Sequence, residues 1–142
     1  MITSKIKFTV KASVEVVWAY LEDVRNYACT IPGCVSCKPT GYDTHHWLFD
    51  FRVGPFVKRM EIRGKTIELD PPHYGKWIGH SDDAIVSGET TIKSLENGNT
   101  GVMYTMEIEP ESIILKCLTP LIKEKMVKDL KQYARNVKNH LE

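Results

Sequence analysis

The sequence predicts one α+β domain in which a curved antiparallel sheet of seven strands wraps around a long C-terminal helix. Between residues 34 and 110 apolar residues mostly alternate with a period of two, which is typical of strands. After Pro110 they recur at intervals of three and four, which is typical of a helix. The turns inside the strand region are short. Because parallel strands need a crossover of a dozen or more residues, the strands are expected to form an antiparallel meander.

The N-terminal part of the chain predicts one strand and two short helices. Alternation over residues 3–11 predicts a half-buried strand. A helix is expected at about 13–22, with Ser13 as its N-cap. A second short helix is expected over 23–28, ended by the Ile31-Pro32-Gly33 segment.

Six further strands are expected in the meander. Glycine, proline, asparagine and aspartate separate them, as turns require. The expected ranges are 34–40, 45–53, 57–69, 73–80, 85–95 and 100–109.

The C-terminal segment predicts a long amphipathic helix. Ile122, Met126 and Leu130 begin an apolar stripe that continues to Leu141, with lysines mostly on the other side. The helix either starts at Thr119-Pro120 or starts near Ser112 and is kinked at Pro120. The second alternative is favoured, because Ile113, Ile114, Leu115 and Leu118 are expected to be buried.

Length and composition favour a single domain over residues 1–142, expected in the cytoplasm. A formal net charge of +1 gives no field that would attract nucleic acid, so no nucleic-acid partner is expected. No apolar run approaches the ~20 residues of a membrane span, and no leader is recognised. The oligomeric state is not predicted.

The strand faces predict an apolar cavity between sheet and helix. One helix cannot cover so large a twisted sheet, which leaves a tunnel. Gly64, Gly75, Gly79 and Gly88 stand where larger side chains would otherwise fill the interior. One alternative is that these side chains simply form a core. Another is an interaction protein whose cavity is filled by its own side chains.

The residues expected to bind a ligand face this cavity. Tyr104 and Thr90 would orient the ligand by hydrogen bonds, and apolar side chains would bury it. Entry is expected between the Asp70-Pro71-Pro72 turn, the 54–57 turn and the start of the C-terminal helix. The full set is Trp47, Phe49, Phe51, Met60, Ile62, Trp77, Thr90, Tyr104, Met106, Ile114 and Leu118.

No catalytic residue, metal site or cofactor is predicted. Cys34-x-x-Cys37 is the one motif that resembles half of a zinc site. A structural zinc site needs four ligands, however, and no second such pair follows. Cys34 and Cys37 are also three apart on a strand, which predicts opposite faces. Small, reduced, buried or half-buried thiols are the favoured interpretation, and zinc is the alternative. His73, His80 and His140 are isolated and are expected at the surface or in loops.

The order of elements resembles the helix-grip fold of the START and Bet v 1-like superfamily, which includes polyketide cyclases and dehydratases. More narrowly, the chain is similar to the G-subunit family of carbon monoxide dehydrogenase. The segments that carry the resemblance are Val16 to Leu21, Ile31-Pro32-Gly33-Cys34, Val53-Gly54-Pro55, Asp70-Pro71-Pro72 and the hairpin from Ser87-Gly88-Glu89 to about Thr100.

This resemblance implies a function and partners. It implies a non-catalytic accessory protein that binds a hydrophobic small molecule, such as a lipid or quinone. Its implied partners are a molybdenum hydroxylase or a membrane surface. The alternative is a polyketide cyclase or dehydratase that uses the same cavity. Ser81-Asp82-Asp83-Ala84-Ile85 departs from the family's glycine-rich approach to the sixth strand.

Overall fold

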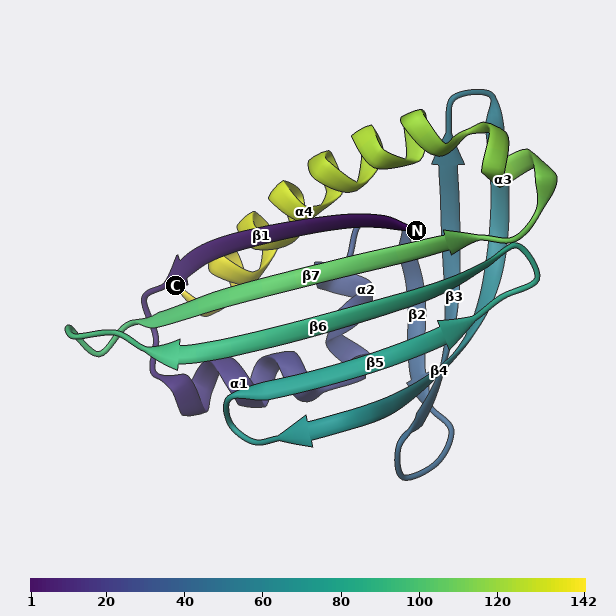
Figure 1. Ribbon diagram of the computed structural model, residues 1–142. Coiled ribbons are helices and arrows are strands. Elements are labelled where there is room, and N and C mark those ends of the chain that lie inside the picture. The colour runs from purple at the N-terminus through teal and green to yellow at the C-terminus, as the bar shows by residue number, and fades with distance from the viewer.

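A seven-stranded antiparallel sheet and one long helix form most of the molecule (Figure 1). The computed structural model describes residues 1–142, apart from the side chain of Ala28. The strands are β1 (Ile2–Val10), β2 (Cys34–Pro39), β3 (Thr44–Val53), β4 (Phe56–Asp70), β5 (Tyr74–His80), β6 (Ala84–Ser94) and β7 (Thr100–Pro110). The helices are α1 (Val14–Glu22), η1 (Val24–Asn26), α2 (Tyr27–Thr30), α3 (Ile113–Cys117) and α4 (Thr119–Leu141).

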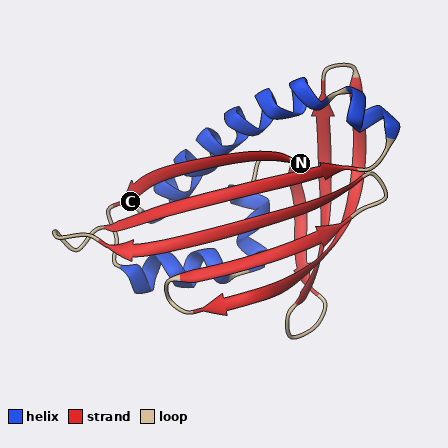
Figure 2. Cartoon of the chain, viewed as in Figure 1, coloured by secondary structure: helices blue, strands red, loops and turns tan.

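The sheet is the predicted meander, with β1 added at its far edge. The strand order is β1-β7-β6-β5-β4-β3-β2, and every neighbouring pair is antiparallel. Strongly twisted sheets of this size curl. Figure 2 shows β2 and β3 turned steeply against β5, β6 and β7, with α4 lying in the concave side.

The N-terminal helices confirm most of the expectation. Ser13 is the N-cap of α1, and its hydroxyl accepts a hydrogen bond from the Val16 backbone N–H. The expected helix at 23–28 is instead a 3-10 turn, η1, followed by the single turn α2. Asp23 explains the difference, because its carboxylate accepts from the Arg25 backbone N–H at 3.0 Å and starts the tighter turn there.

The C-terminal segment combines the two alternatives: it is helical from just after Ser112, as favoured, but it breaks at Leu118 into two helices, and the second starts at Thr119-Pro120 as in the other alternative. Ser112 caps α3, and Leu118 separates α3 from α4 with Pro120 in the first turn of α4. The expected burial is only partly correct. Leu115 is 1% exposed, whereas Ile113 and Ile114 are 80% and 57% exposed. In so short a helix, only one side can face the sheet.

Helix α4 packs chiefly against β1 and covers the sheet unevenly. Its buried residues Ile122, Met126 and Leu130 face the interior, as the stripe predicts. The ammonium of Lys123 donates to the Thr3 carbonyl oxygen of β1, and the Asn136 amide donates to the Thr30 carbonyl oxygen at 3.1 Å. The side of α4 that faces β3 is therefore packed more loosely than the side that faces β1; below it is called the looser side of α4. None of the helices in the described chain has the length and apolar character that a bilayer crossing requires.

Candidate functional site

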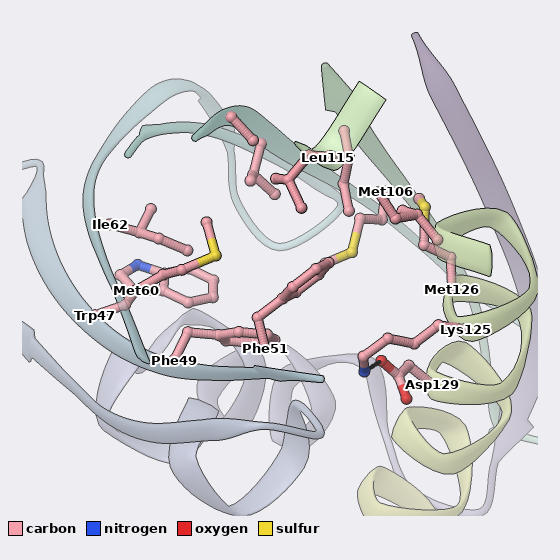
Figure 3. A pocket seen from close by; sticks show the side chains of 14 residues that line it. Trp47, Phe49, Phe51, Met60, Ile62, Met106, Leu115, Lys125, Met126 and Asp129 are labelled. Carbon is pink, nitrogen blue, oxygen red and sulfur yellow. Dashed lines mark hydrogen bonds and ion pairs between the residues drawn. The ribbon is translucent and has the colours of Figure 1, made fainter. Parts of the chain in front are cut away.

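An apolar pocket lies on the looser side of α4, between that helix and the concave face of the sheet (Figure 3). Its volume is about 50 Å³, which is room for a few water molecules. All but two of its lining side chains are apolar. They are Trp47, Phe49, Phe51, Met60, Ile62, Ala84, Val86, Met106, Ile108, Leu115, Ile122, Lys125, Met126 and Asp129.

Six of the predicted ligand-binding residues line this pocket together. They come from three strands and are Trp47, Phe49, Phe51, Met60, Ile62 and Met106. Strand alternation was sufficient to find them, because every second residue of β3, β4 and β7 points into the concave side. Their assignment as ligand contacts remains a prediction.

The other five predicted residues lie outside the pocket wall. Trp77 and Tyr104 are buried deeper in the sheet, and Thr90 is half-buried on β6 opposite Tyr104. Leu118 packs against the core at the kink. Ile114 points away from the interior, so the structure does not place it with the others.

The lining residues that were not predicted come mainly from helices, which the strand pattern does not describe. Leu115, Ile122 and Met126 belong to α3 and α4, and their helical spacing was the available signal. Lys125 was expected on the solvated side of the helix. It lines the pocket instead, because its long stem lies along apolar surface.

Lys125 and Asp129 form an ion pair at one end of the pocket. Their side chains are 21% and 30% exposed, so the pair stands at the rim rather than on open surface. The Lys125 ammonium is 6.0 Å from the ring centre of Phe51. Figure 3 shows this pair at one end of the pocket and Trp47 at the other.

Beyond Trp47 the interior is filled by an aromatic cluster. The ring centres of Trp47 and Trp77 are 4.6 Å apart, those of Trp47 and Tyr27 are 5.2 Å apart, and those of Trp47 and His45 are 5.6 Å apart. Tyr104 continues the cluster towards α4, with its ring centre 4.8 Å from that of Tyr133.

The strand glycines make room for this cluster and not for a ligand. A Cβ on Gly64 would lie 2.2 Å from His45 Nε2, and a Cβ on Gly88 would lie 2.5 Å from Trp77 Nε1. The glycines do face inward as expected. The space above Gly64, Gly79 and Gly88 is nevertheless occupied by protein side chains, so that part of the cavity prediction is wrong.

His45 is a buried histidine that the sequence interpretation did not consider for the cavity. It is 3% exposed, and burial lowers its pKa to about 4, so the imidazole is neutral at pH 7. The signal was present in the alternation, which puts His45 on the same face as Trp47.

Several buried polar atoms in this region have no hydrogen-bond partner among the described residues. In the cluster they are Trp47 Nε1, His45 Nε2 and the Tyr104 hydroxyl. Burial raises the pKa of Tyr104, so its phenol stays protonated. The pocket therefore has an ion pair at its rim and neutral polar atoms near its inner end.

The expected entrance is only partly correct. The β3–β4 turn does lie beside the start of α4, since a Cβ on Gly54 would be 3.1 Å from Leu121 Cδ1. The Asp70-Pro71-Pro72 turn lies at the opposite end of the 15-residue strand β4 (Figure 1). A strand of that length holds its two ends too far apart to share one entrance.

Cys34 and Cys37 are both buried on the inner side of β2, against the expectation of opposite faces. A register shift between Cys34 and Ser36 adds one residue, so Cys34 pairs with Phe49 and Cys37 with Trp47. Burial raises the pKa of these thiols to about 11 and about 12, which makes them poor nucleophiles. Within the described residues, no group of three or more potential ligands is placed to hold a metal ion.

Solved structures with the same fold extend over almost the whole chain. A conserved protein from Geobacillus kaustophilus superimposes with a TM-score of 0.83 at 16% identity, over 99% of this chain and 95% of its own. A START superfamily protein from Mycobacterium smegmatis gives 0.81 at 12% identity, over 98% and 96%. The Zhui aromatase/cyclase from Streptomyces sp. R1128 gives 0.75 at 15% identity, over 98% and 92%.

These neighbours confirm the helix-grip fold, and at such low identity they show the fold alone. Among proteins of curated function, none matches the sequence. The narrower similarity to the G-subunit family of carbon monoxide dehydrogenase stays a prediction. The family model for polyketide cyclase / dehydrase and lipid transport matches residues 1–142, and the chain belongs to that family.

Proposed function

We propose that this protein binds a hydrophobic small molecule of lipid or quinone type in the pocket between β3, α3 and α4, without catalysis. The observation that supports this most directly is the wall of the pocket, which is apolar except for one rim ion pair. Apolar ligands bind to such surfaces because burial removes them from water, at about 25 cal/mol per Å².

The pocket must widen to hold such a ligand, because its volume is about 50 Å³ and known ligand sites are several times larger. Three of its wall residues, Met60, Met106 and Met126, are methionines. Unbranched thioether side chains change rotamer readily and fit irregular ligands. Widening by methionine movement needs no change in the sheet.

Native mass spectrometry of the purified protein is the first test, since a co-purified apolar molecule would identify the ligand class. The second is titration with 1-decanol and with a fully substituted benzoquinone, which cannot add to the exposed thiols of Cys29 and Cys117. Saturable binding of at least one probe is expected.

A matched pair of variants locates the site. Phe49→Asp puts a charge into the pocket wall, and Leu48→Asp puts the same charge on the outer face of the same strand. Phe49→Asp is expected to weaken binding at least tenfold and Leu48→Asp to leave it unchanged. If a folded Phe49→Asp protein binds both probes as the unaltered protein does, the pocket is not the site.

The similarity to the G-subunit family of carbon monoxide dehydrogenase extends the proposal to an accessory role beside a molybdenum hydroxylase or at a membrane surface. Co-purification of a tagged chain from its native cells tests the enzyme partner, and sedimentation with phospholipid vesicles tests the membrane. Recovery of neither would restrict the proposal to ligand binding alone.

A cyclase or dehydratase is the second candidate, favoured by His45. A buried neutral imidazole beside the pocket wall can accept a proton in aldol chemistry. Turnover of a β-polyketone substrate that is abolished by His45→Gln and kept by His46→Gln would favour the enzyme over the binding protein.

A further inference from the structure

Two unpaired hydrogen-bonding groups lie near the inner end of the pocket. The Trp47 side chain is 1% exposed and the Tyr104 side chain 3% exposed. Trp47 Nε1 has no partner among the described residues, and the Tyr104 O–H has no acceptor there, although the Trp77 N–H lies beside the phenol oxygen as a donor. A buried polar group without a partner is destabilising, because it has lost its hydrogen bonds to water. Two such groups in one region indicate that something else pairs with them.

Both groups are next to the apolar wall. Trp47 is itself a wall residue, at the end away from the Lys125–Asp129 pair (Figure 3). Tyr104 stands two residues before the wall residue Met106 on the same face of β7. Trp77 connects them, since its ring lies 4.6 Å from that of Trp47 and its Nε1 is next to the Tyr104 hydroxyl above Gly88.

The chemistry of this inner end favours a neutral partner. Trp47 offers only an N–H, and Tyr104 offers an O–H that stays protonated because burial raises the pKa of its phenol. Tyr27 and Tyr133 lie close by, and burial raises the pKa of both phenols as well. A site that keeps phenols from ionising would also disfavour a carboxylate, because its cost of burial has the same origin.

We propose that the inner end of the pocket binds a neutral hydrogen-bond acceptor of the ligand, such as a ketone or ester carbonyl. The Trp47 Nε1–H and the Tyr104 O–H donate to it. The ligand then enters with its carbonyl first and leaves its apolar part between β3 and α4. Because side chains fill the space above Gly88, the carbonyl reaches the Tyr104 hydroxyl only when the pocket widens past Trp47. This inference rests on the proposed function, because it assigns an orientation and a head group to the ligand of that pocket.

Three ligands of nearly equal shape test the proposal: acetophenone, its alkene counterpart α-methylstyrene, and benzoate. The affinity ratio of acetophenone to α-methylstyrene is measured in the unaltered protein and in each variant. Because the two ligands differ in hydrophobicity by the same amount in every case, a change in the ratio reports the hydrogen bond to the carbonyl. Replacement of Tyr104 by phenylalanine, Tyr104→Phe, is expected to lower this ratio about five- to tenfold, as the loss of one neutral hydrogen bond does. Benzoate is expected to bind more weakly than acetophenone.

Tyr20→Phe is the matched control. It removes another buried hydroxyl without a partner, but Tyr20 lies on α1 against His140, outside the pocket wall. The affinity ratio should not change in this variant. Thermal unfolding of both variants shows whether each is folded.

The indole N–H resonances give a readout that does not depend on a variant. The chain has three tryptophans, and the Trp47 signal is identified by its loss in Trp47→Phe. Acetophenone should move that signal downfield, as a new hydrogen bond does, with Trp18 as internal reference. The alkene should not produce the downfield shift.

The outcomes separate the two proposals. If none of the three ligands binds, the proposed function fails at this size of ligand. If α-methylstyrene binds but Tyr104→Phe leaves the affinity ratio unchanged, ordered water alone pairs with Trp47 Nε1 and the Tyr104 hydroxyl, and the carbonyl inference is wrong. Benzoate binding that is tightest and is lost in Lys125→Met would put the ligand's polar group at the rim instead, which also overturns it.

Discussion

The interior between the sheet and α4 has two regions that are built from the same strands and differ in packing. In the cluster around Trp47 and Trp77, rings lie over strand glycines and fill the space. In the pocket beneath α4, methionine and phenylalanine side chains leave about 50 Å³ open. Alternation along a strand describes both regions equally, so it cannot distinguish them.

The difference teaches that a glycine in a strand need not leave room for a ligand. A glycine removes one side chain, and in this sheet a large ring from a neighbouring strand takes its place, as His45 does above Gly64. Space remains where α4, packed chiefly against β1, covers β3 loosely. The position of the covering helix therefore decides where the pocket lies.

The largest expected contrast comes from truncating one residue in each region. Trp77→Ala should lower the free energy of unfolding by about 3–5 kcal/mol, because it leaves a large void in a filled cluster. Met106→Ala should cost about 2 kcal/mol or less, because Met106 is only partly buried and already borders open space. Urea unfolding measures both, and equal losses would show that the two regions are packed alike.

Acid should destabilise the cluster through His45. Its pKa is about 4 in the folded chain and ordinarily 6.5, so the unfolded chain takes up the proton first as the pH falls. Stability is therefore complete above pH 6.5 and declines towards pH 4. Between pH 7.5 and 5 the loss should be about 2 kcal/mol.

The comparison that isolates this effect uses His45→Gln and His46→Gln. His46 lies on the outer face of the same strand with 40% of its side chain exposed. The pH-dependent loss should be absent from His45→Gln and present in His46→Gln. The opposite pattern would show that His45 is not the buried titrating group.

The sequence was sufficient for the sheet and for six of the 14 residues that line the pocket. Periodicity gave the strands, and with them Trp47, Phe49, Phe51, Met60, Ile62 and Met106 on the pocket wall. It could not give the side of Cys37, because one register shift in β2 reverses the alternation. Nor could it place Lys125 or Ile114, since the rotation of α3 and α4 against the sheet depends on tertiary packing.

A methyl group added to a strand glycine tests whether the cluster is filled. Gly64→Ala should destabilise the chain by about 1–2 kcal/mol, because the new Cβ would lie 2.2 Å from His45 Nε2 and the ring must shift. Gly101→Ala is the control, since its Cβ would meet Leu95 at an ordinary 3.4 Å. That variant should be unchanged or stabilised by up to about 1 kcal/mol. Similar losses in both would point to backbone strain instead of the filled space.

The smallest effect is expected where the pocket is filled from its own wall. Ala84 on β6 is 1% exposed and lines the pocket, so Ala84→Val would place two methyl groups in open apolar space. We expect stabilisation by up to about 1 kcal/mol, together with weaker binding of 1-decanol, because the added methyl groups occupy the ligand's place. Ala134→Val adds the same groups to α4 at a buried position outside the pocket wall, where overpacking should cost about 1–3 kcal/mol. If Ala84→Val is as destabilising as Ala134→Val, the space beneath α4 is too small to accept even two methyl groups, and the contrast between the two regions is lost.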